Sequence, residues 1–226
     1  MNLGKAKINN IPYLGVYAVC TDNFCLVPNN ILKKEEVIIE KYLKTKIIKM
    51  AVSDSPLIGV YLLAHKDKIM VCKNSIKQNE LDIFEKEGIK VKIIKEDYNA
   101  LGNLVAFNSN YGFASALLSN KTVSEISSFF DIEVERKTLF SMDILGSSLY
   151  VNDSLFMVNP NVSEKDFNYF KQKFKVEGIA TTLNYGDLFV GNDVIANKNS
   201  VLVGDSTSNI ELMKVDDIVL MQESKV

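Results

Sequence analysis

The chain has 226 residues, of which 47% are hydrophobic and 24% charged, and its net charge is -2. This composition is typical of a globular protein and excludes collagen-like and intrinsically disordered chains. Arg136 is the only arginine, and DNA- or RNA-binding domains usually carry a strong basic excess, so autonomous nucleic-acid binding is not expected.

Membrane insertion and disulfide bonding are also not expected. The longest apolar run, Leu57 to Ala64, has eight residues, whereas a bilayer-spanning helix needs about 20. No signal-peptide core follows Met1, and the three cysteines are an odd number. We therefore expect a soluble, cytoplasmic protein in a reducing compartment.

A dipeptide of one apolar residue followed by glycine recurs along the chain, with steps of 44, 43, 44 and 45 residues between successive glycines. The third to fifth residues after each glycine are apolar, which is typical of a strand covered on both faces. The sixth to eighth are polar and rich in Asn and Asp, which indicates a hairpin turn. The repeat glycines, to which we assign a structural role, are Gly15, Gly59, Gly102, Gly146 and Gly191.

The elements that follow each hairpin turn are predicted, in chain order, as a returning strand, a helix and a closing strand. The first repeat has strands over Phe24 to Val27 and Lys46 to Val52 around a helix over Lys33 to Leu43, and the second has strands over Ile69 to Val71 and Lys90 to Lys95 around a helix over Glu80 to Glu87. The third has a helix over Val123 to Phe130 and a closing strand over Glu133 to Phe140, and the fourth has strands over Leu155 to Val158 and Val176 to Leu183 around a helix over Glu164 to Phe174. The fifth has a strand over Val201 to Val203 and a weak helix over Asn209 to Val215.

The fifth repeat lacks a closing strand, because only 35 residues follow Gly191. Lys5 to Ile8 lies before Gly15 at the distance at which a closing strand precedes the other repeat glycines. We therefore predict a ring of five pseudo-symmetric ββαβ repeats that start near residues 11, 55, 98, 142 and 187, with residues 1–10 completing the last. This makes residues 1–226 one α/β propeller domain, expected as a monomer.

Several short strings together resemble a known family over nearly the whole chain. They are Asn99-Ala100-Leu101-Gly102-Asn103-Leu104, Ile11-Pro12 with Leu14-Gly15-Val16, Leu145-Gly146-Ser147 with Asn159-Pro160, and Val203-Gly204-Asp205-Ser206-Thr207 with Glu211-Leu212. The strings are similar to those of archaeal translation initiation factor 6, and five ββαβ units in a ring resemble the pentein fold, the five-bladed α/β propeller. Departures are Asn209-Ile210 in place of a Gly-Pro pair, and Cys72 in place of proline.

The resemblance implies a translation factor that binds the large (50S) ribosomal subunit and sterically prevents its association with the small (30S) subunit. Such a block needs no enzymatic activity and no cofactor. Because this chain has a mildly acidic net charge, its main contact would be a basic ribosomal protein, and ribosomal RNA would be a secondary contact. Alternatives are a guanidino-modifying enzyme, as found among other proteins of the pentein fold, and a protein-interaction platform unrelated to translation.

Polar residues follow three of the repeat glycines and are the candidate partner-binding residues. Asn103, Ser147 and Asn192 occupy the position directly after the glycine, and Asn99 lies close by in the chain. Pseudo-symmetry places them at one end of the ring, where each strand is expected to begin. Two interpretations remain open: they contact the ribosomal partner, or they hydrogen-bond neighbouring blades around a wet channel.

Other candidate sites have simpler structural interpretations. Cys20, Cys25, Cys72 and His65 do not have the spacing of a zinc site, and the first two occupy apolar columns, so no metal is predicted. His65 is the only histidine and no cysteine follows Cys72, which disfavours thiol catalysis. The lysines between Lys33 and Lys49 are interspersed with glutamates, as on a solvated helix face, with an RNA contact as the alternative.

Overall fold

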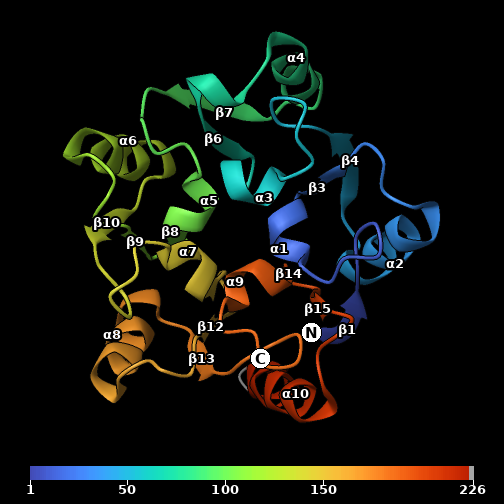
Figure 1. The fold of residues 1–226 in the computed structure, drawn as a ribbon, viewed down its shortest axis with the longest axis vertical. Coiled ribbons are helices and arrows are strands. Elements are labelled where there is room, and N and C mark those ends of the chain that lie inside the picture. Colours follow the sequence, from blue (N-terminus) through green and yellow to red (C-terminus); the bar gives the residue numbers. More distant parts are fainter. Residues whose placement is uncertain (224–226) are drawn as a thin grey trace.

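The structure of the chain, a computed structural model, describes residues 1–223. Within these residues, five three-stranded sheets stand around a central axis, with a longer helix outside each (Figure 1). Helices of a single turn lie on the inner side of the sheets and surround the axis. The predicted five-bladed α/β propeller is confirmed.

The sheets and their outer helices follow the predicted repeats. The first blade contains β2 (Val19–Cys20), β3 (Phe24–Pro28), β4 (Lys46–Met50) and α2 (Lys33–Leu43). The second contains β5 (Leu63–His65), β6 (Lys68–Cys72), β7 (Lys90–Ile94) and α4 (Gln78–Lys86), with a 3-10 turn over Lys73–Ser75. The third contains β8 (Val105–Phe107), β9 (Tyr111–Ala114), β10 (Glu133–Arg136) and α6 (Asn120–Phe130). The fourth contains β11 (Leu149–Val151), β12 (Leu155–Val158), β13 (Glu177–Ala180) and α8 (Glu164–Phe174).

The fifth blade joins strands from the two ends of the described chain. It contains β14 (Val194–Ala196), β15 (Ser200–Gly204), β1 (Asn2–Ala6) and α10 (Asn209–Glu223). β1 pairs in parallel with β15 from Asn2 opposite Ser200 to Ala6 opposite Gly204, as β4 pairs with β3 in the first blade. Closure of the ring by the N-terminal strand is therefore confirmed. The strand lies earlier than Lys5 to Ile8, because Asn9 and Asn10 form a tight turn that pairs Ile8 with Ile11.

The inner helices were not predicted. They are α1 (Leu14–Tyr17), α3 (Ile58–Tyr61), α5 (Leu101–Leu104), α7 (Leu145–Ser148) and α9 (Val190–Asp193). Each apolar-glycine pair therefore opens one helical turn, and the strand begins three or four residues after the glycine rather than directly after it. One helical turn brings the glycine against the neighbouring blade, which an extended chain would not do.

Buried hydrophobic clusters fill the spaces between blades and hold the ring together. Between the third and fourth blades, Phe113 packs edge-on against Phe170 and Phe174, with ring centroids 5.1 and 5.4 Å apart. The other interfaces are built mainly from Leu, Ile and Val of adjacent sheets. This packing of rigid elements makes the disc a stiff body.

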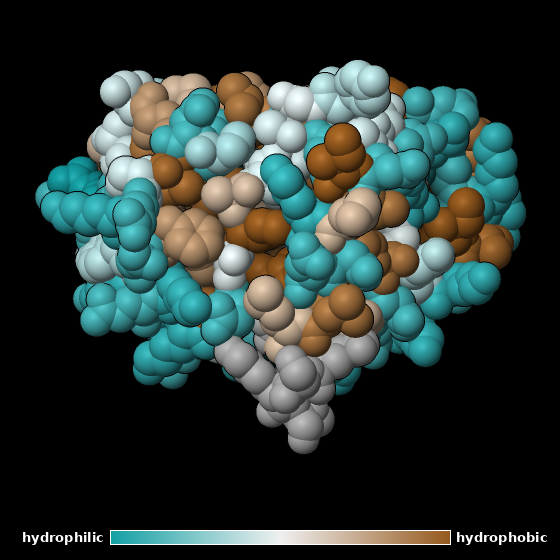
Figure 2. Space-filling view, turned by 90° about the horizontal axis from the view of Figure 1, so that it is seen from below, coloured by the Kyte–Doolittle hydropathy of each residue, from teal (hydrophilic) through white to brown (hydrophobic). Residues whose placement is uncertain are grey.

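The outer surface around α10 is mixed in character (Figure 2). Ile210, Met213, Leu220 and Met221 of this helix are exposed, whereas Val215, Ile218 and Val219 are buried in the hydrophobic cluster between the fourth and fifth blades. In the described part of the chain, no helix is both long and apolar enough to cross a membrane.

Candidate functional site

The repeat glycines meet at the centre of the disc and form what we call the glycine ring. A Cβ atom on Gly59 would lie 1.8 Å from the carbonyl oxygen of Gly15, and one on Gly102 would lie 1.8 Å from that of Gly59. Gly146 and Gly191 continue the series, and Gly15 closes it, since its Cβ would lie 2.1 Å from the oxygen of Gly191. No side chain fits at these positions without displacing backbone, so the inner helices depend on glycine here.

The glycine ring and the inner helices form one face of the disc, which we call the glycine face. Asn103 and Asn192 lie on it half-buried, at equivalent positions of α5 and α9, whereas Ser147 on α7 is only 3% exposed. The side chains of Asn103 and Asn192 form no hydrogen bond with any other described residue. The hydrogen bonds between blades that we considered for these two amides are therefore not present in this part of the chain.

Asn99 and Ser147 stand apart from these two amides. Asn99 is half-buried in the loop that leads into α5, beside Ala100 at the start of that helix. Ser147 is too deeply buried to offer its hydroxyl to a large partner. Of the predicted partner-binding residues, the structure thus brings Asn103 and Asn192 to equivalent, accessible positions on the glycine face, whereas Asn99 lies in the loop that leads to it.

Tight turns lead into the inner helices and form the rim of the glycine face. Two successive residues have positive φ in four of these turns, at Asn9-Asn10, Ser53-Asp54, Phe140-Ser141 and Asn184-Tyr185. Such a conformation exposes backbone N–H groups that need acceptors.

Glutamates at the third position of three outer helices supply acceptors for three of these turns. Glu80 on α4 accepts hydrogen bonds from the N–H groups of Ser53 and Asp54 at 2.9 and 3.1 Å, and Glu35 on α2 accepts from Asn9 and Asn10. Glu211 on α10 does the same for Tyr185 and Gly186. Sequence analysis missed this role, although the glutamate recurs at the same helical position and was a usable signal. The effect is to fix the rim to the outer helices.

The hydrogen bonds also control the ionisation of Glu211. Burial by itself would raise the pKa of this carboxyl group. Hydrogen bonds from Thr182, Ser208 and Gly186 outweigh burial and hold the pKa at about 2. The glutamate therefore stays ionised, which is the form that accepts several hydrogen bonds at once.

The rim combines exposed aromatic rings with carboxylates. Tyr13 and Tyr98 are 41% and 48% exposed, and Tyr185 is 85% exposed. The loops that lead into α3, α5, α7 and α9 carry Asp54, Asp97, Asp143 and Asp187, of which the first three are exposed. Asp54 forms an ion pair with Lys77. The glycine face thus has an uncharged centre with unpaired amides and a rim that is aromatic and acidic.

A buried carboxylate lies under this face, directly after Asn192. Asp193 is 0% exposed, and its Oδ1 accepts a hydrogen bond of 2.7 Å from Asn184 Nδ2, whereas its Oδ2 has no partner among the described residues. Asn184 Nδ2 also donates to the carbonyl oxygen of Pro12, which links the fifth blade to the first. Burial, followed by the nearby charge of Asp187, raises the pKa of Asp193 from 3.8 to about 7.

This raised pKa predicts a specific pH dependence of stability. The folded state holds the Asp193 proton more tightly than the unfolded state does. Protonation of Asp193 therefore stabilises the folded protein at pH 4, and this stabilisation is lost as the pH rises to 7. The change is expected to be about 2–4 kcal/mol in the free energy of unfolding. Asp193→Asn mimics the neutral acid and should be more stable than the wild type at pH 8, with little difference at pH 4. Urea unfolding at both pH values measures this.

The exposed Asp143→Asn is the matched control and should follow the wild-type pH profile. Parallel profiles for Asp193→Asn and the wild type would contradict a neutral Asp193 in the folded protein.

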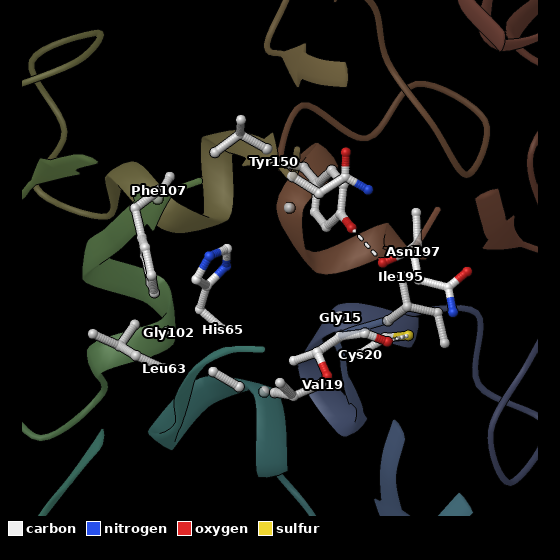
Figure 3. A pocket seen from close by; sticks show the side chains of 18 of the residues that line it. Gly15, Val19, Cys20, Leu63, His65, Gly102, Phe107, Tyr150, Ile195 and Asn197 are labelled. Atoms are coloured by element: carbon white, nitrogen blue, oxygen red, sulfur yellow. Dashed lines mark hydrogen bonds between the residues drawn. The ribbon is translucent and has the colours of Figure 1, made fainter. Parts of the chain in front are cut away.

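The opposite end of the axis opens into a channel of about 240 Å³ (Figure 3). Cys20, His65, Phe107 and Tyr150 lie around it, and the Tyr150 hydroxyl donates to the carbonyl oxygen of Ala196 at 3.1 Å. Burial lowers the pKa of His65, whose Nε2 is hydrogen-bonded to Ser109 Oγ at 2.8 Å.

The three cysteines and the histidine do not all meet at one site, although Cys20 and His65 both line the channel. Cys20 and Cys25 lie in the first blade, whereas Cys72 is buried in the second. The hydrogen bond of His65 goes to Ser109 rather than to a thiol. Among residues 1–223, no three His, Cys, Asp or Glu side chains are grouped so that they could hold a metal ion.

The lysine-rich stretch of the first repeat carries several ion pairs. Lys33 and Lys49 pair with Glu36 at 3.3 and 2.7 Å, and Lys46 pairs with Glu87. The hydrogen bond from Lys49 is the main cause of a lowered pKa of Glu36. These pairs are typical of a solvated surface.

Comparison with known proteins finds relatives along nearly the whole chain. The model of the eIF-6 family matches residues 3–218. Translation initiation factor 6 of Pyrococcus abyssi (strain GE5 / Orsay) is 30% identical over 223 residues, which cover 96% of this chain and 98% of that protein. The protein of the same name from Sulfolobus acidocaldarius is 26% identical over 220 residues, with 95% and 97% covered. Among solved structures, a DDAH variant from Pseudomonas aeruginosa in complex with citrulline has a TM-score of 0.48 and 12% identity, covering 74% of this chain and 68% of that one.

Proposed function

The chain belongs to the eIF-6 family and is a translation factor, and on this premise we propose that it binds the large ribosomal subunit and sterically prevents association with the small subunit. It would act as a monomer in the cytoplasm. The docking surface in this proposal is the glycine face, with Asn99, Asn103 and Asn192 in contact with the partner.

The single observation that carries the choice of face is the pair of unpaired amides. Asn103 and Asn192 lie at equivalent positions on a rigid ring and have no hydrogen-bond partner in the described protein. Amides on a preorganised surface bind a partner without loss of much conformational entropy. The surrounding tyrosines fit this role, since tyrosine is enriched at the centres of protein interfaces.

The charge of the rim supports a basic protein as the main contact. Asp97 and Asp143 are exposed in loops at the edge of the glycine face, and Asp187 is half-buried there. Carboxylates repel RNA phosphates and attract the lysines and arginines of a ribosomal protein. Ribosomal RNA would then be a secondary contact at the edge of the disc.

A steric block follows from shape. Stable protein complexes bury about 800 Å² of surface per partner. A face of a rigid disc can provide an interface of this size. The opposite face, with the hairpin turns, would then stand where the small subunit has to dock. No group transfer or cofactor enters this function.

Cosedimentation with purified large subunits tests the proposed face. Asn103→Asp removes the amide donor and places a charge at an uncharged contact, and an unpaired charge is costly to bury. We expect binding at least about tenfold weaker, equivalent to about 1.4 kcal/mol. The melting temperature should stay close to that of the wild type, because Asn103 forms no hydrogen bond in the described protein.

The control makes the same chemical change on the other face. Asn23 is exposed in the first hairpin turn, and Asn23→Asp should bind large subunits as the wild type does. Equal binding by Asn103→Asp and Asn23→Asp would contradict docking through the glycine face. Failure of the wild type to cosediment would contradict ribosome binding altogether and would favour an interaction platform outside translation.

A further inference from the structure

Two cysteines of the first hairpin lie directly opposite each other. Cys20 of β2 pairs with Cys25 of β3 in an antiparallel register. Thr21 N donates to the carbonyl oxygen of Phe24 at 2.9 Å, so the adjacent pair is the hydrogen-bonded one and the cysteines occupy a non-hydrogen-bonded position. At such positions the Cα atoms are about 4.5 Å apart, within the range of about 4.4–6.8 Å that a disulfide requires.

The two thiols also share one face of the sheet. Both side chains belong to the same hydrophobic cluster between the first and fifth blades, together with Ala18 and Ile195. Cys20 Sγ donates to the carbonyl oxygen of Thr21 at 3.3 Å, and burial, followed by the neighbouring Cys25 thiol, raises the pKa of the Cys20 thiol. Because the two residues lie directly opposite each other on one face of the sheet, their thiols are within reach of each other, as bond formation requires.

Access from solvent differs between the cysteines. Cys20 lies at the wall of the channel (Figure 3), which is open on the side of the hairpin turns. Cys25 is 0% exposed, and Cys72 is 1% exposed in the second blade, where burial raises its pKa to about 11. A small reagent can thus reach Cys20 directly, and Cys25 can react only through Cys20.

We propose that Cys20 and Cys25 form a dithiol modification site that a low-molecular-weight disulfide, such as oxidised glutathione, converts to an intramolecular disulfide. The Cys20 thiolate attacks one sulfur of the reagent, breaks its S–S bond and releases one reduced thiol. The Cys25 thiolate then attacks Cys20 Sγ, which forms the protein disulfide and releases the second thiol. The protein loses two electrons to the reagent, and the two thiol protons end on the released thiols.

This modification is independent of the ribosomal function. It would tie together the two strands that follow α1, and so rigidify the hairpin next to Gly15 of the glycine ring. Reducing agents reverse it, because the same exchange runs backwards when thiols are in excess. The rate should rise between pH 7 and pH 9, since the thiolate is the attacking species.

Mass spectrometry of the folded protein tests the site. The protein is incubated with excess oxidised glutathione at pH 8 and then unfolded in acid, and the free thiols are alkylated. We expect a monomer lighter by two hydrogens before alkylation, with Cys72 as the one alkylated residue. Chymotryptic cleavage after Phe24 should give two peptides joined by the disulfide.

Two variants separate the steps. Cys72→Ser should form the disulfide as the wild type does, and Cys25→Ser should stop with glutathione attached to Cys20. Glutathione retained on Cys20 of the wild type, a disulfide that includes Cys72, or three thiols still open to alkylation would each overturn the proposal. Circular dichroism checks whether Cys25→Ser folds. If it does not, the mass spectrum of the oxidised wild type still tests the proposal by itself.

Discussion

Removal of residues 1–9 should unfold the fifth blade and destabilise the whole ring. β1 forms a five-residue parallel ladder with β15, and Ala6 and Ile8 are buried between the fifth and first blades. Lys7 also forms an ion pair of 2.9 Å with Asp205. Loss of a paired, half-buried strand is expected to cost at least about 5 kcal/mol. For a chain of this size this corresponds to a melting temperature lower by about 10–20 °C.

A point substitution distinguishes loss of the paired strand from a general effect of shortening the chain. Ala6→Asp places a carboxylate at a residue that is 4% exposed and should destabilise strongly, whereas Asn2→Ser changes an exposed residue at the start of the same strand and should not. Thermal unfolding followed by circular dichroism measures both. If the truncated protein has the same melting temperature as the wild type, the ring does not need this strand.

Gly59→Ala is expected to be the most damaging single-methyl change in the protein. The added Cβ would lie 1.8 Å from the carbonyl oxygen of Gly15 and 2.8 Å from that of Ala18, both of which are backbone atoms. Relief of the clash requires two neighbouring blades to move apart at the centre of the disc. We expect at least about 3 kcal/mol of destabilisation, the upper end of overpacking effects. Urea unfolding of the purified variant measures it.

Gly88→Asn is the matched control for this substitution. Gly88 has a φ of +69° at the end of α4, and a Cβ there would have no neighbour within 4 Å. Asparagine tolerates this conformation better than other residues, so the cost should stay below about 1 kcal/mol. Equal destabilisation at Gly59 and Gly88 would contradict close packing of the glycine ring.

The ring could be predicted from the sequence because the same pattern of buried strands and polar turns recurs with a constant step. The bounds of α2 and α8 also agree with the prediction, and α8 begins as expected with Ser163, whose Oγ accepts from the N–H of Asp166 at 3.0 Å. In these elements local propensity, capping and tertiary packing favour the same structure.

The inner helices could not be predicted for a physical reason. Four residues such as Leu101 to Leu104 show the same apolar pattern in one helical turn as in a short strand. What decides between them is the contact of Gly102 with the Gly59 backbone, which lies in another blade. Local sequence holds no signal for such a contact.

The end of α10 shows a second limit. Lys44, Asp131 and Lys175 adopt positive φ and end α2, α6 and α8. Leu220 stands at the corresponding position of α10, but the helix continues through it to Glu223 instead of ending near Val215 as predicted. The weak amphipathic pattern of this segment hid its length.

Only part of the candidate site could be predicted. Asn103 and Asn192 occupy equivalent positions of α5 and α9, as the repeat implies, but the burial of Ser147 depends on packing that the sequence does not display. The raised pKa of Asp193 likewise arises from its enclosure beneath the turn at Asn184. The role of these residues in partner binding stays a prediction.

Subunit joining tests the central proposal most directly. Purified large subunits are incubated with the protein, small subunits are added, and the fraction of joined ribosomes is read from a sucrose gradient. We predict that, at a protein concentration about tenfold above the wild-type Kd, the wild type and Asn23→Asp remove most of the joined peak, whereas Asn103→Asp, which binds at least about tenfold more weakly, leaves at least about half of it. A joined peak of full height with the wild type bound to the large subunit would contradict a steric block.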